Sequence, residues 1–197
     1  MEHQTLFSNS FLRSVFSKEF KEFVGSNTHQ KLKTRLKSWG HRDVLKETSA
    51  ASTFISEFFG KTWGYHGDGQ ESDTPGYTYY PEYPIAHAGQ RGGTGFADIA
   101  LGWFGASNYA DTPQVLGEFK DVRAGLDSPQ KRKGNTRSPV KQCADYLKYA
   151  HRDYYGNEAI LPSWGIVTDM NEFRLYHWRS MPEQYQRFVV RGDGQEL

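Results

Sequence analysis

Cysteine and long apolar runs are scarce in this chain of 197 residues, and each scarcity excludes a class of protein. The single cysteine, Cys143, excludes an internal disulfide and a cysteine-rich zinc module. No apolar run approaches the roughly 18 residues that a membrane span needs, and the N-terminus has no signal-peptide core. We therefore expect a cytoplasmic protein that does not associate with a membrane.

A large excess of one charge is also lacking, because the formal net charge is +1. The cations are nevertheless concentrated in two segments. Residues 31–46 contain six Lys or Arg against one Asp, and residues 120–142 contain seven against two. Such segments are typical of contact with a polyanion, although two solvated faces of a globular domain would give the same pattern.

Aromatic residues are abundant, with 13 Phe, 12 Tyr and 5 Trp, so the chain can build a substantial core. Apolar periodicity predicts helices over 10–24, over a short basic segment that contains Leu32, Leu36 and Trp39, over 43–61 and over 140–150. Aromatic and β-branched runs predict strands over 77–85, 96–104 and 115–122, and a hairpin formed by 164–168 and 173–178. Because Pro81 and Pro84 interrupt the first of these strands, we expect it at a sheet edge.

This order of elements predicts an α/β (α+β) fold, a mixed β-sheet flanked by helices. We expect an N-terminal helical extension over residues 1–42 and a core domain over 43–180. Residues 181–197 are then expected to be a C-terminal tail or the start of a linker to another domain.

Two predicted strands carry charged residues where a strand normally buries apolar side chains. Asp98 lies within an apolar run, and Glu118 and Lys120 stand two residues apart on the next strand, so both share one face. Two carboxylates supply hard oxygen ligands that suit Mg²⁺, with Mn²⁺ as a substitute. Lys120 would then orient the attacking water. The alternative interpretation is a buried ion pair between an acid and Lys120, with no metal.

These residues form the pattern Asp98…Glu118-Phe119-Lys120, an acid on one strand followed by Glu-X-Lys on the next. Together with the segments GFADIALG, LGEFKDVRAGLDSPQKRK, SPVKQCADYL and WGIVTDMNEFRLY, the pattern resembles the PD-(D/E)XK nuclease superfamily, in particular the N-terminal nuclease domain of type IIG restriction–modification enzymes. The resemblance extends from about Lys46 to Trp178. It implies a restriction-endonuclease-like fold and a magnesium-dependent endonuclease that hydrolyses double-stranded DNA.

The resemblance also implies roles for further residues. The Gln-X-X-X-Tyr motif of these nucleases matches Gln142 and Tyr146, which share a helix face at a spacing of four. A glutamate on the preceding helix is expected to complete or support the metal site. We assign Glu47, which lies on the helical face of Phe54, and keep Glu57 as the second candidate.

Cations of the segment 123–141 are expected to bind DNA phosphates with salt-sensitive affinity, with Tyr146 in support. They are Arg123, Lys131, Arg132, Lys133, Arg137 and Lys141. Phosphate contacts do not select a sequence, so target recognition is expected to belong to another domain or subunit.

Two departures from the family pattern bear on this interpretation. Ala97 stands where the family pattern has proline before the strand acid, and the chain contains no Asn-Pro-Pro-Tyr methyltransferase motif. We therefore expect methyltransferase and target-recognition domains or subunits to lie outside this chain. Two alternatives stay open: a catalytically inactive nucleic-acid-binding module, and a subunit-docking module on the same fold.

Overall fold

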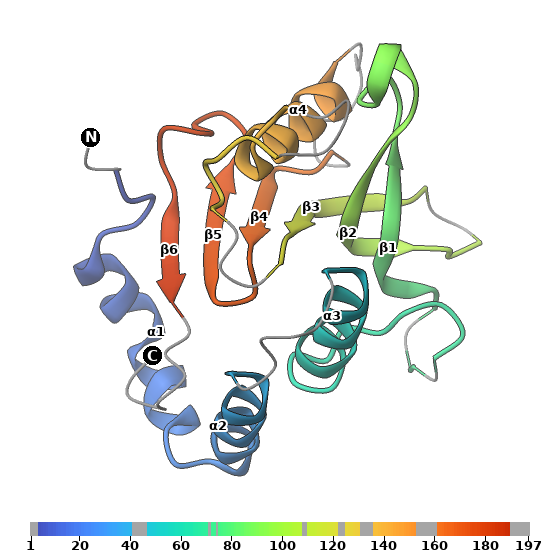
Figure 1. Cartoon of the computed structure of the whole chain (residues 1–197). Coiled ribbons are helices and arrows are strands. Elements are labelled where there is room, and N and C mark those ends of the chain that lie inside the picture. Colours follow the sequence, from blue (N-terminus) through green and yellow to red (C-terminus); the bar gives the residue numbers. More distant parts are fainter. Residues whose placement is uncertain are drawn as a thin grey trace.

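The fold is a six-stranded mixed sheet with helices on both of its faces, as a computed structural model of the chain shows (Figure 1). The structure describes residues 4–40, 47–70, 72–73, 75–107, 110–121, 125–130, 136–152 and 161–189. The predicted fold class, α+β with a mixed sheet flanked by helices, is confirmed. None of the helices described here combines the length and the apolarity needed to cross a bilayer.

The strands lie in the sheet in the order of the sequence, β1-β2-β3-β4-β5-β6. Their bounds are β1 Tyr77–Ile85, β2 Gly95–Phe104, β3 Thr112–Phe119, β4 Trp164–Thr168, β5 Glu172–His177 and β6 Gln186–Val189. Neighbouring strands are antiparallel except for β3 and β4, which are parallel. A parallel pair needs a crossover connection, and helix α4 (Pro139–His151) supplies it.

The N-terminal part of the chain is helical. Its elements are α1 (Asn9–Phe23), α2 (Asn27–Gly40) and α3 (Glu47–Phe54), which continues into the π-helical turn η1 (Ile55–Gly60). A short 3₁₀ turn, η2 (Gln90–Gly92), joins β1 to β2. Serine caps begin two helices, because the side chains of Ser8 and Ser138 accept hydrogen bonds from the backbone of Phe11 and Lys141.

Each face of the sheet has its own apolar core. One core joins α4 to the sheet through Cys143, Tyr146, Leu147, Ala100, Leu116 and Val167. The other joins α2, α3 and η1 to the opposite face through Leu32, Trp39, Phe54, Phe58, Ile99 and Phe119. The successive residues Ile99 and Ala100 belong to different cores, as the alternation of side chains along a strand requires.

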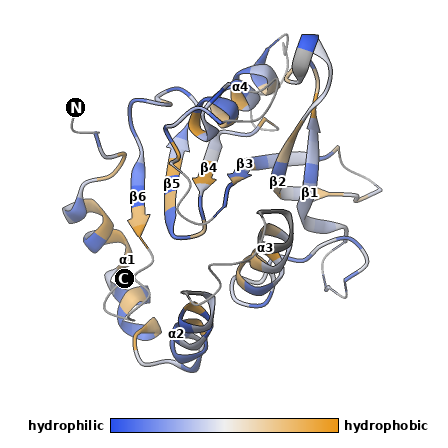
Figure 2. Cartoon of the chain, viewed as in Figure 1, coloured by the Kyte–Doolittle hydropathy of each residue, from blue (hydrophilic) through white to orange (hydrophobic). Residues whose placement is uncertain are grey.

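Helix α1 differs from the other helices because it has no buried residues. Most of its apolar side chains are about half exposed, namely Phe11, Val15, Phe16, Phe20 and, directly after the helix, Val24. Figure 2 shows apolar positions alternating with polar ones along α1. The predicted helix is present, and its contact with the cores comes from Phe23 at its end, which packs against the core of α2, α3 and η1.

Two segments differ in detail from the prediction, and the first strand agrees with it. The third strand ends at Phe119 rather than at residue 122, and Lys120 continues the pairing by donating its backbone N–H to the carbonyl of Thr168 at 2.8 Å. The first strand is at the sheet edge, as its prolines predict. Within the predicted tail, Gln186–Val189 forms β6 and pairs with β5 along the other edge.

Candidate active site

The two strand acids lie at the point where the β2–β3 ladder ends. Ile99 pairs with Gly117 there, and Asp98 and Glu118 are the next residues of the two strands. Because side chains alternate, Asp98 shares a face with Ala100, and Glu118 shares a face with Leu116. Since Ala100 and Leu116 both belong to the α4 core, the two carboxylates lie on the face that α4 covers.

Lys120 forms an ion pair with Glu118 on this face. Its Nζ atom donates to Oε1 of Glu118 at 2.5 Å. Glu118 is 1% exposed and Lys120 is 5% exposed, so both charges are removed from water. A buried carboxylate requires a compensating cation, and the structure supplies one two residues away. Asp98, Glu118 and Lys120 therefore lie on one face of the sheet.

Asp98 is held by a backbone contact at the same strand end. Its Oδ2 atom accepts a hydrogen bond from the backbone N–H of Phe119 at 2.6 Å. This bond joins β2 to β3 just beyond their last ladder pair, which is Ile99 and Gly117. The Asp98 side chain thus fixes the separation of the two acidic positions.

Gln142 and Tyr146 face this site from helix α4. The Nε2 atom of Gln142 donates to the Tyr146 hydroxyl at 2.8 Å, and Gln130 donates to Oε1 of Gln142 at 3.2 Å. Burial, followed by the negative charge of Glu118, raises the pKa of Tyr146 to about 12, and Asp98 adds to the shift. The charges of Glu118 and Asp98 therefore both raise the pKa of the Tyr146 phenol, which stays protonated at neutral pH.

Gly95, at the start of β2, leaves room for this tyrosine. A Cβ atom at Gly95 would lie 2.9 Å from Cε1 of Tyr146, which is closer than side chains pack. The absence of a side chain at Gly95 thus permits α4 to approach the strands that carry the acids.

Cys143 lies on α4 between Gln142 and Tyr146, and it is completely buried. Its Sγ atom donates weakly to the carbonyl of Leu116 at 3.8 Å. Burial, with a further contribution from Glu118 and Asp98, raises the pKa of this thiol well above its ordinary value. Nucleophilic cysteines have a lowered pKa, whereas that of Cys143 is raised. We therefore interpret Cys143 as a packed core residue.

The two candidate helix acids have different positions. Glu47 is the first residue of α3, and its side chain lies outside the described residues. Glu57 forms ion pairs with Lys61 at 2.5 Å and with Arg35 of α2 at 3.6 Å. The Arg35 pair joins η1 to α2, and η1 packs on the face of the sheet opposite to Glu118.

Most of the cations predicted to bind DNA lie outside the described residues, namely Arg123, Lys131, Arg132 and Lys133. Arg137 forms an ion pair with Asp145 of α4 at 3.0 Å. Lys141 is exposed in the first turn of the same helix. Both lie on the segment that leads to Gln142, so they flank the site.

A second charged group on the α4 face was not predicted. The strand register continues from Glu118 through Val167 to Arg174 and then to Arg187. Arg174 binds both carboxylate oxygens of Asp127 at 2.8 Å and Oε1 of Glu172 at 2.6 Å. The spacing of two residues between Glu172 and Arg174 can be read from the sequence. The contact of Arg174 with Asp127 cannot, because Asp127 is 47 residues away along the chain.

The donor set determines which metal the site suits. Within the described residues, no group of three or more His, Cys, Asp or Glu side chains is placed to hold a metal. Asp98 and Glu118 are two carboxylates on neighbouring strands, and Mg²⁺ is bound in many proteins by one or two carboxylates while it keeps several waters. The oxygen chemistry of the pair thus fits Mg²⁺ and does not fit zinc.

No protein family model matches the chain, and neither a curated protein nor a solved structure matches it.

Proposed function

We propose that this chain is a magnesium-dependent endonuclease domain that hydrolyses phosphodiester bonds of double-stranded DNA. The observation that carries the proposal is the placement of Asp98 and Glu118 where the β2–β3 ladder ends, on one face, with Lys120 against Glu118. Residue spacing along one strand does not explain why Asp98 lies next to Glu118, because Asp98 belongs to the neighbouring strand β2.

Each residue of the site has a role in this proposal. Asp98 and Glu118 would hold Mg²⁺, which supplies charge neutralisation at the phosphate and promotes attack by water. Lys120 would orient the attacking water from its position beside Glu118. The Gln142 amide, fixed by its contacts with Tyr146 and Gln130, would bind the DNA backbone or the water.

The resemblance to PD-(D/E)XK nucleases supports a wider assignment. On this resemblance, the domain would act in a restriction–modification system of the cytoplasm, next to methyltransferase and target-recognition domains or subunits. Arg137 and Lys141 would contact DNA phosphates at the start of α4, together with the cations of residues 123–133. Glu47 stays the candidate for the helix acid.

A docking function is the second candidate, and one observation favours it. Three phenylalanine side chains of α1, namely Phe11, Phe16 and Phe20, are about half exposed. Exposed apolar surface of this kind marks interaction sites. The Glu118–Lys120 ion pair is compatible with a non-catalytic scaffold too, so metal binding and cleavage must distinguish the two functions.

The test uses Asp98→Asn, which keeps an acceptor for the Phe119 N–H and removes the charge. We expect plasmid cleavage in Mg²⁺ to fall at least about a hundredfold, and calorimetric binding of Mn²⁺ to be lost. Asp68→Asn, an identical change at an exposed loop residue, is the control and should leave both unchanged.

Unaltered Mn²⁺ binding by Asp98→Asn would refute the site. An unmodified protein that binds no Mn²⁺, and no DNA at low salt, would support the docking function instead.

A further inference from the structure

Residues 125–130 lie, along the chain, between two elements of the candidate site. They follow β3, which carries Glu118, and they precede α4, which carries Gln142. A turn closes within this segment, because the backbone N–H of Ser128 donates to the carbonyl of Gly125 at 3.1 Å. Contacts that fix the segment can therefore also fix groups of the site.

Two backbone hydrogen bonds fasten the segment to the start of α4. The N–H of Val140 donates to the carbonyl of Leu126 at 3.3 Å, and the N–H of Gln130 donates to the carbonyl of Arg137 at 3.2 Å. The side chain of Leu126 is buried in the core that α4 shares with the sheet. One end of the segment is thus held by packing and the other by the residue that precedes the helix cap.

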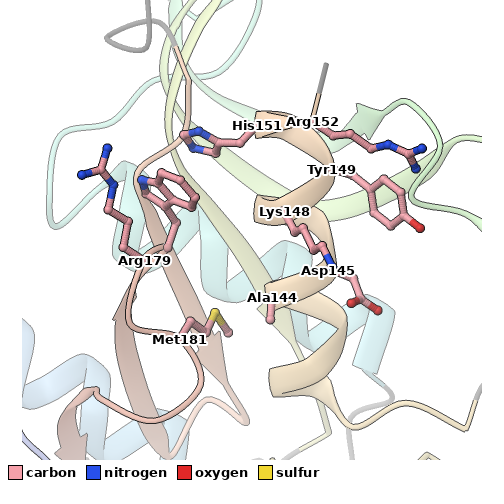
Figure 3. A pocket seen from close by; sticks show the side chains of 9 residues that line it. Ala144, Asp145, Lys148, Tyr149, His151, Arg152, Arg179 and Met181 are labelled. Carbon is pink, nitrogen blue, oxygen red and sulfur yellow. The ribbon is translucent and has the colours of Figure 1, made fainter. Parts of the chain in front are cut away.

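Arg137 is in turn held by α4. Its Nη1 atom lies 3.0 Å from Oδ2 of Asp145. Figure 3 shows the Asp145 carboxylate on the side of the helix that faces away from Arg179, whose turn lines a hollow of about 910 Å³ together with α4. The ion pair restrains the backbone carbonyl that accepts from Gln130.

Asp127 fastens the same segment to the sheet. The Nη1 atom of Arg174, on β5, donates to both carboxylate oxygens of Asp127 at 2.8 Å. The side chain of Arg174 is 11% exposed, whereas that of Asp127 is 71% exposed. A guanidinium fixed in the sheet thus binds a carboxylate on the surface.

Arg174 is itself restrained by its neighbours on the sheet. Its Nε atom donates to Oε1 of Glu172 at 2.6 Å, and Glu172 also accepts from Arg187 at 2.8 Å. The guanidinium lies 4.8 Å from the centre of the Tyr185 ring. These contacts define the orientation of the guanidinium, so that Arg174 can act as a fixed point for Asp127.

The segment reaches the candidate site through Gln130. The Nε2 atom of Gln130 donates to Oε1 of Gln142 at 3.2 Å, and Nε2 of Gln142 donates to the Tyr146 hydroxyl at 2.8 Å. The oxygen and the nitrogen of the Gln142 amide therefore each have a partner. The orientation of this amide depends on where residues 125–130 place Gln130.

We propose that Arg174, acting through Asp127, is a positioning residue of the candidate site. The Arg174–Asp127 pair holds residues 125–130 where Gln130 orients the Gln142 amide. The inference rests on the proposed function, which gives Gln142 its role toward the DNA backbone or the attacking water. Because small displacements of a group at the reacting centre reduce the rate strongly, loss of the pair should slow cleavage and leave the metal ligands intact.

Asp127→Ala tests the positioning apart from catalysis. The side-chain amide signals of Gln130 and Gln142 are assigned by NMR with Gln130→Ala and Gln142→Ala proteins. In Asp127→Ala we expect both signals to shift, and the backbone amides of Gln130 and Val140 to exchange at least about tenfold faster. The melting temperature should fall by no more than about 3 °C, because an ion pair with one exposed partner contributes little to stability.

Three further variants complete this test. Arg174→Gln should shift the Gln142 signal as Asp127→Ala does, and the double variant should add nothing, since either change breaks the same pair. Asp127→Glu keeps the carboxylate and should restore most of the original signal. Asp68→Ala makes the matched change at an exposed loop residue and should alter neither the signals nor the exchange rates.

Plasmid cleavage in Mg²⁺ provides the functional readout. We expect kcat of Asp127→Ala to be at least about tenfold lower, with most of the loss recovered in Asp127→Glu. Calorimetric affinity for Mn²⁺ should stay within about twofold of that of the unmodified protein, because Asp98 and Glu118 are unchanged. A purely structural role for Asp127 would instead reduce the melting temperature and Mn²⁺ affinity together.

The outcomes separate the positioning role from the proposed nuclease. Unshifted Gln142 signals in Asp127→Ala, or additive effects of the Asp127 and Arg174 variants, would overturn the positioning role. Shifted signals with unchanged kcat would overturn it as well. Shifted signals in a chain whose unmodified form binds no Mn²⁺ would reject the nuclease and still support the control of Gln142 by Arg174.

Discussion

The Nζ atom of Lys120 lies 2.5 Å from Oε1 of Glu118, and both side chains are almost completely buried. Such a pair contributes little net stability compared with apolar residues of the same size, because both charges lose their hydration. A catalytic role would explain why the pair lies in the core of the sheet, and the proposed nuclease gives it that role.

Removal of one partner should destabilise the fold. Lys120→Ala leaves the Glu118 carboxylate buried without its cation, and we expect the free energy of unfolding to fall by about 3–5 kcal/mol in urea denaturation. The double variant Glu118→Gln/Lys120→Met should regain most of this loss, because it removes both charges.

Lys61→Ala provides the control for the lysine variant. Lys61 pairs with Glu57 at 2.5 Å, but its side chain is 59% exposed, so the expected loss is about 0–1 kcal/mol. Similar losses in Lys61→Ala and Lys120→Ala would contradict the buried ion pair.

Tyr146 should make the stability of the protein sensitive to alkaline pH. Its pKa is raised to about 12 in the folded chain, whereas in the unfolded chain it has the ordinary value near 10. The folded state thus holds the proton more tightly, and its advantage is complete below pH 10 and decreases as the pH rises toward 12. The free energy of unfolding should fall by no more than about 1.4 kcal/mol per pH unit from this residue.

Tyr146→Phe should flatten that decline, as measured by denaturation at a series of alkaline pH values. Tyr149→Phe makes the same change at a less buried position of the same helix, and it should leave the decline in place. An unchanged slope in Tyr146→Phe would show that other groups cause the alkaline loss.

Gly117 should tolerate no side chain. A Cβ atom there would lie 2.5 Å from Cγ2 of Ile99, in the last pair of the β2–β3 ladder. Gly117→Ala must therefore displace Ile99 or the strand, and we expect a loss of about 1–3 kcal/mol on thermal or urea unfolding. Because Asp98 and Glu118 follow this pair directly, cleavage should decrease as well.

Gly60→Ala is the comparison for this substitution. The nearest atoms to a Cβ at Gly60 are 3.7 and 3.8 Å away, so alanine fits without displacement. Its free energy of unfolding should be unchanged or slightly higher, since alanine favours helical structure. A stable Gly117→Ala protein with unchanged cleavage would argue against close packing at the strand ends.

Local sequence patterns predicted many of the elements for a physical reason. The run Trp164–Thr168 is a strand with the predicted bounds, and α1 and α4 begin one residue before the predicted positions. Apolar periodicity and capping residues act within a few positions along the chain, so they are readable from the sequence. β6 was missed because Gln186–Val189 has little apolar alternation, and its structure depends on the open edge of β5.

The sequence also predicted that α1 is amphipathic, but not that most of its apolar side chains stay about half exposed. Periodicity reports which side chains share a helix face and does not report what covers that face. The same limit applies to Arg174, whose partner Asp127 is 47 residues away along the chain.

By itself, the sequence determined that Glu118 and Lys120 share one side of a strand, because alternation along an extended backbone is a property of covalent geometry. Only the tertiary structure decided that Asp98 stands beside them, that Gln142 meets Gln130, and that Arg179 lies across a hollow from Lys148. These relationships depend on strand register and helix packing between distant segments, and long-range burial, not local spacing, selects them.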